Sequence, residues 1–83
     1  MSLPPESEVA DAILTLAHER GAGRTLCPSE VARRLSEDWR PLMDEVRRVA
    51  AGLAEDGRIR VTRKGCEVEA RTARGPIRLG LPG

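Results

Sequence analysis

The chain is predicted to fold as a winged helix-turn-helix, a mainly α-helical domain with three helices and a small antiparallel β-hairpin or sheet. Residues 6–20 have the apolar periodicity of a helix, and residues 25–56 read as a short helix, a tight turn and a longer helix. After Gly57 the apolar period changes from 3.6 to 2, which is typical of a hairpin. A helix beside a basic hairpin has a shape that fits a duplex groove and its phosphates.

Length and composition predict one small domain with an aliphatic core. The 83 residues include 40% apolar residues, which together with the helical periodicity argues against a disordered chain despite 33% charged residues. A chain of this size buries only about 60% of the surface that its unfolded form exposes. We expect a single winged-helix domain over residues 1–83, with a flexible lead-in over residues 1–5 and a C-terminal strand or strap over residues 72–83.

The predicted core contains no aromatic ring unless Trp39, the only aromatic residue, contributes one. A buried anchor is one interpretation of Trp39, and a contact to DNA or to a protein is the other. The aliphatic core is expected to contain Ile13, Leu16, Leu35, Val46, Val49, Leu53, Ile59 and Val61.

Several classes of protein are disfavoured by what the sequence lacks. Cys27 and Cys66 are far apart and have no neighbouring thiol or imidazole, so their spacing builds neither a zinc site nor a dithiol motif. No apolar run approaches the roughly 20 residues of a membrane span, and the N-terminus lacks the layout of a secretory signal. One histidine and no glycine-rich phosphate loop disfavour an enzyme. We expect a cytoplasmic protein that is not an enzyme and has no metal, cofactor or membrane contact.

The first two helices have recognisable start and stop signals. The first is expected from Glu6 to Arg20, with Val9, Ile13 and Leu16 as its apolar stripe, and a very short strand over residues 24–26 is expected to pair with the hairpin. The second opens at Cys27-Pro28-Ser29-Glu30, where the Glu30 carboxylate can accept a hydrogen bond from the Cys27 amide. The Cys27 thiol is either a small buried hydrophobe or a thiolate stabilised by the helix N-terminus.

The third helix is expected over residues 40–56, with Pro41 in its first turn and Gly57 at its end. Its exposed face is predicted to comprise Arg40, Asp44, Arg47, Arg48, Ala51 and Glu55. Arginine makes bidentate bonds to guanine edges and also contacts phosphates, so Arg40, Arg47 and Arg48 are the predicted DNA contacts. The structural alternative is an ion-pair ladder centred on Asp44.

The hairpin is expected over residues 58–71, with its turn at Arg63-Lys64-Gly65. Arg63 and Lys64 are predicted to contact phosphates, and the alternative is that they protect a strand edge from pairing with another chain. A further short strand is expected within residues 74–81, where Pro76 predicts an edge position.

The basic residues concentrate in the second half of the chain. Residues 1–39 hold four arginines and seven acidic residues, whereas residues 40–83 hold ten basic and six acidic residues. This asymmetry predicts positive potential on the third helix and hairpin, which Arg74 and Arg78 extend.

Four segments, CPSEVARRL, WRPLMDEVRRVA, GRIRVTRKG and GPIRL, cover most of residues 24–81. They resemble a small bacterial family described only as a domain of unknown function with a winged-helix-like fold. The resemblance implies that fold and a bacterial, cytoplasmic origin, and it implies no activity. From the residues themselves we expect a module of the transcription-regulator type that binds double-stranded DNA. The alternative is a non-enzymatic protein–protein docking module, which the near-neutral net charge favours.

Overall fold

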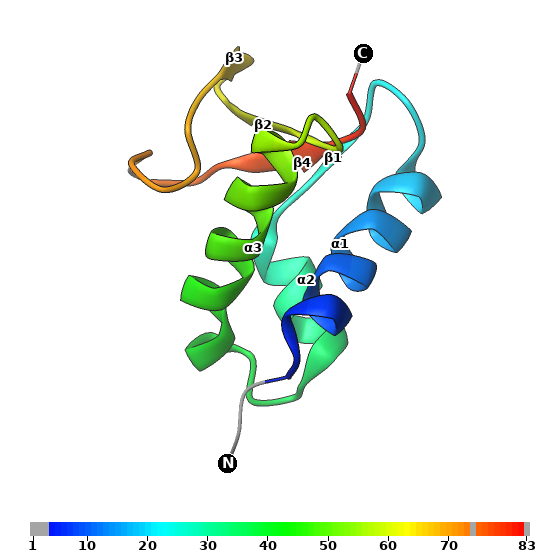
Figure 1. The fold of residues 1–83 in the computed structure, drawn as a ribbon, viewed down its shortest axis with the longest axis vertical. Coiled ribbons are helices and arrows are strands. Elements are labelled where there is room, and N and C mark those ends of the chain that lie inside the picture. The colour runs from blue at the N-terminus through cyan, green and yellow to red at the C-terminus, as the bar shows by residue number, and fades with distance from the viewer. Residues whose placement is uncertain (1–3, 74, 83) are drawn as a thin grey trace.

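Three helices lie on one side of a small antiparallel sheet in the computed structural model, which describes residues 4–73 and 75–82 (Figure 1). In chain order the elements are α1 (Glu6–Arg20), β1 (Thr25–Leu26), α2 (Pro28–Leu35), the 3₁₀ turn η1 (Arg40–Leu42), α3 (Met43–Glu55), β2 (Arg60–Arg63), β3 (Cys66–Glu67) and β4 (Arg78–Gly80). The predicted fold class is confirmed, and the arrangement is compatible with a winged helix-turn-helix. Residues 1–3 of the expected lead-in, and Arg74, lie outside the described residues.

The helix boundaries follow the sequence signals closely. The predicted bounds of α1 are confirmed, with acidic residues in its first turn and Gly21 at its end. At the start of α2 the Glu30 Oε2 atom accepts a hydrogen bond from the Cys27 amide at 2.7 Å, as predicted. Glu30 also pairs with Arg20 at the end of α1, so one carboxylate begins α2 and joins two helices. Pro41 lies in η1, which continues directly into α3.

One residue of α3 was assigned to the wrong face. Ala51 was predicted to be exposed, but only 3% of its surface is accessible. The chain after β3 returns to this side of the helix, and Ala70 from that segment is also buried. Tertiary contact therefore extends the buried face of α3 beyond the stripe that its own periodicity defines.

The hairpin is shorter than predicted. Its turn consists of Lys64 and Gly65 alone, with φ values of 52° and 83°, and Arg63 belongs to β2, where it pairs with Cys66. Two successive residues with positive φ match the twist of a two-residue hairpin loop. The expected return strand over residues 66–71 ends after Glu67. The amides of Thr72 and Ala73 then both donate to the Glu69 carbonyl, so the chain makes a helical turn instead of a ladder.

The C-terminal strand occupies the centre of the sheet, where an edge strand was predicted. The strand order is β1-β4-β2-β3, and β4 pairs antiparallel with both β1 and β2. The expected pairing of β1 with the hairpin was therefore also wrong. Pro76 precedes the first paired residue, Arg78, so its missing N–H group interrupts no ladder hydrogen bond. Residues 64–77 connect the neighbouring strands β2 and β4, and we call this connection the wing.

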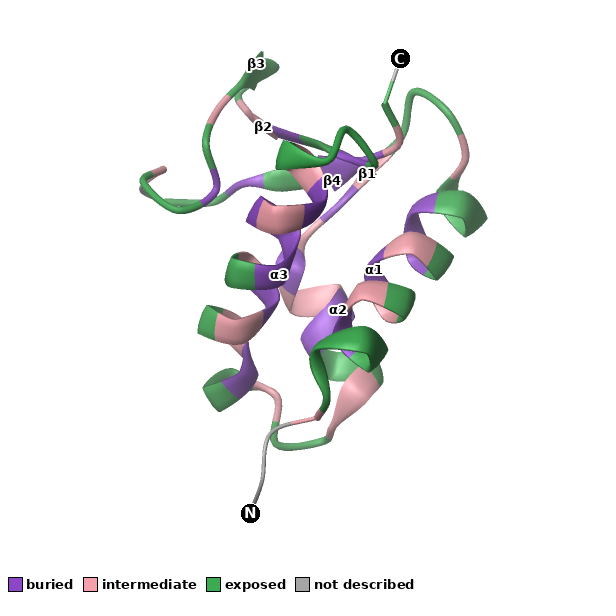
Figure 2. Cartoon of the chain, in the orientation of Figure 1, coloured by how far each residue is buried: buried purple, intermediate pink, exposed green. Residues whose placement is uncertain are grey.

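The core lies between the sheet and the three helices (Figure 2). Seven of the eight predicted core residues are buried, and Leu35 packs against the core while remaining partly exposed. Trp39 also packs at the margin, so the buried-anchor interpretation holds only in part. Core residues that were not predicted include Leu26 of β1, Leu79 of β4 and Ile77, which directly precedes β4.

Replacement of Leu79 by alanine tests the central position of β4. Because Leu79 is fully buried, we expect Leu79→Ala to lower the free energy of unfolding by about 2–5 kcal/mol. Leu81→Ala, at a half-buried position just beyond the strand, should cost clearly less. Urea denaturation measures both values, and equal effects would contradict this packing.

Replacement of Glu30 by glutamine tests the joint between α1 and α2. The ion pair with Arg20 and the hydrogen bond from the Cys27 amide lower the pKa of Glu30 below its ordinary value of 4.5. Its contribution to stability is therefore present above that pH and lost as the pH falls through the lower pKa of the folded state. We expect Glu30→Gln to destabilise the domain by about 1 kcal/mol at neutral pH, and by less at about pH 3.

Denaturation at both pH values measures this difference. Glu37→Gln, in the exposed turn after α2, is the control and should leave the stability unchanged. A Glu30→Gln effect that is the same at both pH values would show that the carboxylate charge is not what stabilises the joint.

Candidate nucleic-acid interface

The five residues predicted to contact DNA fall into three places on the folded chain. Arg47 and Arg48 lie on α3 beside the wing, Arg40 lies in η1 before the first residue of α3, and Arg63 and Lys64 belong to the hairpin. The first pair shares a hollow with one further basic residue, Arg71.

That hollow is a cleft of about 340 Å³ between α3 and the wing. We call it the arginine cleft. Three of the residues that line it are arginines, one is acidic and one is small: Asp44, Arg47, Arg48, Ala70 and Arg71. Arg71 was not among the predicted contacts, because alternation placed it on the return strand, which ends at Glu67 and does not reach residue 71. The bend of the wing towards α3 brings it to the cleft.

Arg47 holds the wing in place. Its Nη1 atom donates to the Ala73 carbonyl at 3.3 Å, and its Nη2 atom donates to the Gly75 carbonyl at 2.7 Å. The planar guanidinium suits this double contact, which a lysine ammonium reproduces less well. Arg47 is consequently half-buried, and it both lines the arginine cleft and positions the wing.

Arg48 is exposed and paired with two carboxylates. Its Nε and Nη2 atoms donate to Glu45 at 2.8 and 2.7 Å, and Nη2 also donates to Glu6 of α1 at 3.3 Å. Pairing with Arg48 holds the pKa of Glu45 below its ordinary range, and both carboxylates raise the pKa of Arg48. Among the described residues the ion pairs of Arg48 are thus made with Glu45 and Glu6, whereas the expected ladder was centred on Asp44.

Arg71 also pairs with an exposed carboxylate, that of Glu55 at the end of α3. The side chains of Arg48 and Arg71 are 51% and 46% exposed, and water screens such pairs strongly. Exchange of these carboxylates for another anion therefore costs little, and both guanidiniums remain usable for binding.

Arg40 stacks on Trp39 together with a residue that was not predicted, Arg33 of α2. Both guanidinium carbons lie 4.6 Å from the centroid of the Trp39 ring. A cation over an aromatic face keeps its charge and its hydrogen-bond donors. This corner between α2 and η1 therefore presents two arginines to solvent beside one half-buried ring.

Only one of the two predicted hairpin contacts faces solvent. Lys64 is exposed in the turn, whereas Arg63 is half-buried and its side chain folds towards Gly75 of the wing. The Arg63 Nε atom is buried without a hydrogen-bond acceptor among the described residues. Arg47 of α3 and Arg63 of β2 thus both approach the wing at Gly75.

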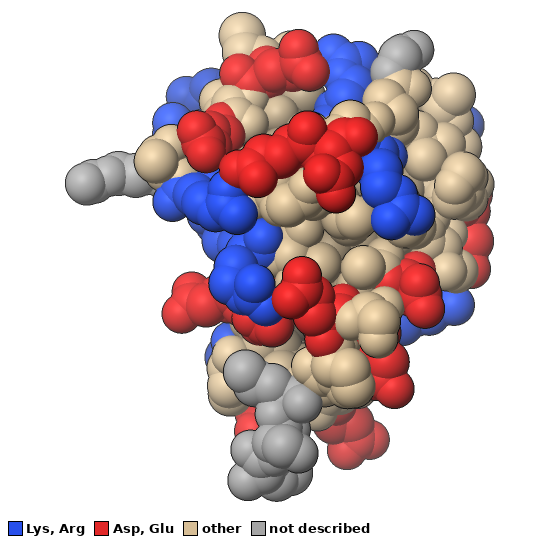
Figure 3. Space-filling view, viewed as in Figure 1, with Lys and Arg blue, Asp and Glu red and all other residues tan. Residues whose placement is uncertain are grey.

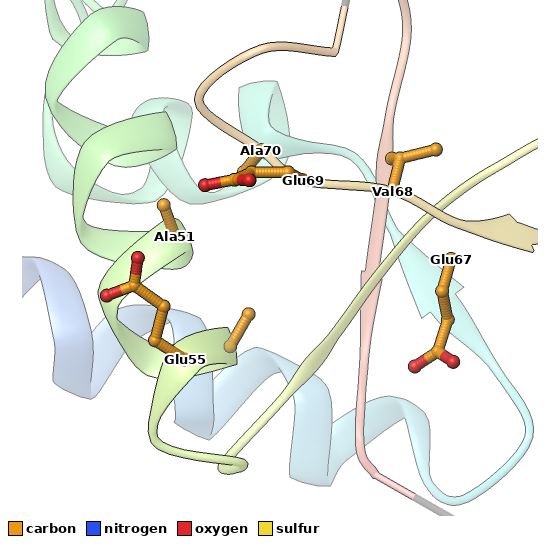
Figure 4. Close-up of a pocket in the computed structure, with 7 residues that line it drawn as sticks. Ala51, Glu55, Glu67, Val68, Glu69 and Ala70 are labelled. Atoms are coloured by element: carbon orange, nitrogen blue, oxygen red, sulfur yellow. The ribbon is translucent and has the colours of Figure 1, made fainter.

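A second hollow, of about 470 Å³, lies beside the arginine cleft and has the opposite character (Figure 4). We call it the acidic hollow. Ala51 and Ala54 of α3 face Val68 and Ala70 of the wing across it. The carboxylates of Glu55 and Glu69 lie near α3, whereas Glu67 lies farther from the helix (Figure 4). Acidic and basic side chains are accordingly interspersed on the face that Figure 3 presents.

The cysteines have separate surroundings. The Cys27 Sγ atom is half-buried and accepts a hydrogen bond from Arg78 Nη1 at 3.0 Å, while Cys66 is exposed. Arg78 is 51 residues away in sequence, so adjacency along the chain could not reveal this contact.

The family of the chain follows from a comparison with known protein families. Residues 6–82 match the family described as "Protein of unknown function (DUF3253)". The chain belongs to this family. The match spans all three helices and all four strands, so the family domain is the whole fold described above. A comparison with curated proteins finds no match.

No helix within residues 4–73 and 75–82 is both long enough and apolar enough to cross a membrane.

The role of Arg47 can be separated from that of its neighbour by conservative replacement. Arg47→Lys keeps the charge but loses the double contact to the wing, so we expect the amides of Thr72 and Ala73 to exchange about fivefold to tenfold faster. Arg48→Lys is the matched control, because among residues 4–73 and 75–82 the hydrogen bonds of Arg48 go to the Glu45 and Glu6 carboxylates and not to the wing backbone. Hydrogen exchange measured by NMR tests this. Equal exchange rates in the two variants would show that Arg47 does not hold the wing.

Proposed function

We propose that the domain binds double-stranded DNA, with α3 directed to the major groove and the wing beside it. The observation that carries this proposal is the arginine cleft, where Arg47, Arg48 and Arg71 gather around a single acidic residue, Asp44. The two exposed guanidiniums, of Arg48 and Arg71, suit the phosphate backbone, which supplies most of the affinity of such modules, while Arg47 holds the wing beside them. The proposal assigns no catalytic step and implies a compartment that holds DNA, in keeping with the expected cytoplasmic location.

The second part of the proposed contact is the N-terminal end of α3. Arg33 and Arg40 stack on Trp39 there, and neither makes an ion pair among the described residues. In helix-turn-helix proteins the first residues of the recognition helix reach base edges. Arg40 is therefore proposed to face the groove and Arg33 to face a phosphate, with Lys64 as a separate phosphate contact from the hairpin turn.

Binding requires the exposed ion pairs of the cleft to exchange partners. A phosphate that replaces Glu45 and Glu6 at Arg48, or Glu55 at Arg71, exchanges one surface pair for another. The favourable term is then the release of counterions from the duplex, which makes the affinity strongly dependent on salt.

Fluorescence anisotropy of labelled duplexes across a salt series tests the proposal. We expect micromolar binding at low salt that weakens steeply as salt is added, with a logarithmic slope that falls by about one unit in each of Arg48→Gln and Arg71→Gln. Arg34→Gln is the matched control, because Arg34 is equally exposed but pairs with Glu19 on α1. Quenching of Trp39, the only tryptophan, should report contact at the α2–η1 corner.

Salt-independent binding, or no binding at micromolar protein in low salt, would overturn the proposal. If Arg48→Gln and Arg71→Gln have the same salt slope as the Arg34→Gln control, the duplex does not bind at the arginine cleft.

A non-enzymatic docking module is the second candidate function, and the acidic hollow favours it. Small apolar side chains of α3 and the wing accompany the Glu55 and Glu69 carboxylates there. Such a surface suits an arginine or lysine of a protein partner, with its stem on the alanines and its charge on the carboxylates. Titration with a short arginine-containing peptide tests this candidate. Binding should be lost in the Glu55→Gln, Glu69→Gln double variant, which should retain any affinity for duplex DNA.

A further inference from the structure

The face of the sheet that points away from the helices carries an ordered pattern of side chains. The register sets Thr25 of β1, Gly80 of β4 and Arg60 of β2 in one row across three strands. Alternation along each strand turns their neighbours Leu26, Leu79 and Val61 into the core. The outward row therefore has a residue without a side chain at its centre.

Gly80 is required at that position by the close approach of β1. A Cβ atom there would lie 3.0 Å from the Arg24 carbonyl oxygen and 3.3 Å from the Thr25 methyl carbon. The gap belongs to a hollow of about 250 Å³, which we call the sheet hollow. Besides Gly80 and Thr25, it is lined by Arg24, Arg60 and Thr62, with the glycines of two turns and Leu81 completing its walls.

The sheet hollow has a positive character. Arg60 flanks Gly80 from β2, and Arg24 precedes Thr25 on the opposite flank, so two arginine residues line the hollow from two sides. None of the described residues that line it is acidic. The Arg24 guanidinium has no partner among residues 4–73 and 75–82, and Arg60 has only an exposed pair with Glu67 at 3.6 Å.

Arg78 adds to this potential without occupying the hollow. Its guanidinium donates to the hydroxyl and carbonyl oxygens of Thr25 at 3.0 and 3.1 Å and to Cys27 Sγ. No carboxylate is among these acceptors, although the Glu30 carboxylate of α2 lies near enough for the charge of Arg78 to lower its pKa.

We infer that the sheet hollow binds a phosphate group. Two arginines on opposite flanks match the dispersed charge and several acceptor oxygens of a phosphate, for which guanidinium is the preferred protein partner. A volume of about 250 Å³ exceeds the space of one bare oxyanion, so the hollow also accommodates part of the molecule that carries the phosphate. That molecule is either a small phosphorylated compound or a nucleic-acid backbone.

This site is separate from the interface proposed for duplex DNA. The helices, including α3, lie on the other side of the sheet (Figure 1), and the residues that line the sheet hollow are not those of the arginine cleft. Failure of either proposal therefore leaves the other unaffected.

Titration of the ¹⁵N-labelled chain with sodium phosphate, against sodium chloride at equal ionic strength, tests the inference. We expect saturable shifts of the Gly23, Thr62 and Gly80 amides with phosphate. Arg24→Gln and Arg60→Gln should each weaken this binding about tenfold. Arg34→Gln removes one charge elsewhere on the surface and should have no effect.

A variant that is expected to bind phosphate more tightly provides a second test, which does not depend on the loss of binding. Glu67 competes for Arg60, so Glu67→Gln should strengthen phosphate binding about threefold. The dispersion of the amide spectrum shows in each case that the variant is folded.

A short duplex added in place of phosphate distinguishes the two sources. Arg24-dependent shifts of the Gly80 amide with duplex alone would identify a nucleic-acid backbone as the ligand, whereas saturation by phosphate ion would identify a small phosphorylated compound. Absence of saturable shifts with both ligands, or shifts that persist in the Arg24→Gln, Arg60→Gln double variant, would overturn the inference.

Discussion

The insertion of β4 between β1 and β2 is the constraint on which the rest of the structure depends. Hydrogen bonds on both sides of β4 close the sheet, and Leu79 fills the core from its centre. Because β2 and β4 are neighbours, the wing first forms β3 on the outer edge of β2 and must then return to β4 on the other side of β2. A connection of that length is too long for a tight turn, so it folds back onto α3, buries Ala51 and Ala70 and makes the walls of two hollows.

This arrangement divides the arginines of α3 between structure and binding. Arg47 donates to the wing carbonyls and so helps to hold the wing against the helix. Arg48 and Arg71 make ion pairs that are exposed to solvent. The contact of Arg47 with the wing therefore also forms the arginine cleft. The exposed guanidiniums of Arg48 and Arg71 lie together there, and each can exchange its carboxylate partner for another anion.

The alternation of charge along α3 limits how any ligand can lie on it. Ala70 lines both the arginine cleft and the acidic hollow, so positive and negative surfaces adjoin on one helix. A duplex that followed the whole helix would bring its phosphates against Glu55 and Glu69, which like-charge repulsion opposes. Contact confined to the N-terminal part of α3 avoids this repulsion and includes Arg40 and Arg33. A basic partner would instead favour the C-terminal part.

The sequence alone determined the helices, the position of the hairpin and most of the core, because these depend on local periodicity, caps and glycine positions. It also identified the arginines of α3. Only the tertiary structure decided what those arginines contact, since the acceptors of Arg47 are wing carbonyls 26 and 28 residues away. Contacts between distant segments likewise place β4 at the centre of the sheet and bury Ala51. They also place Gly80 in the row of side chains on the outer face of the sheet. Local patterns carry no information on that pairing, because strand order is set by which apolar faces fill the shared core.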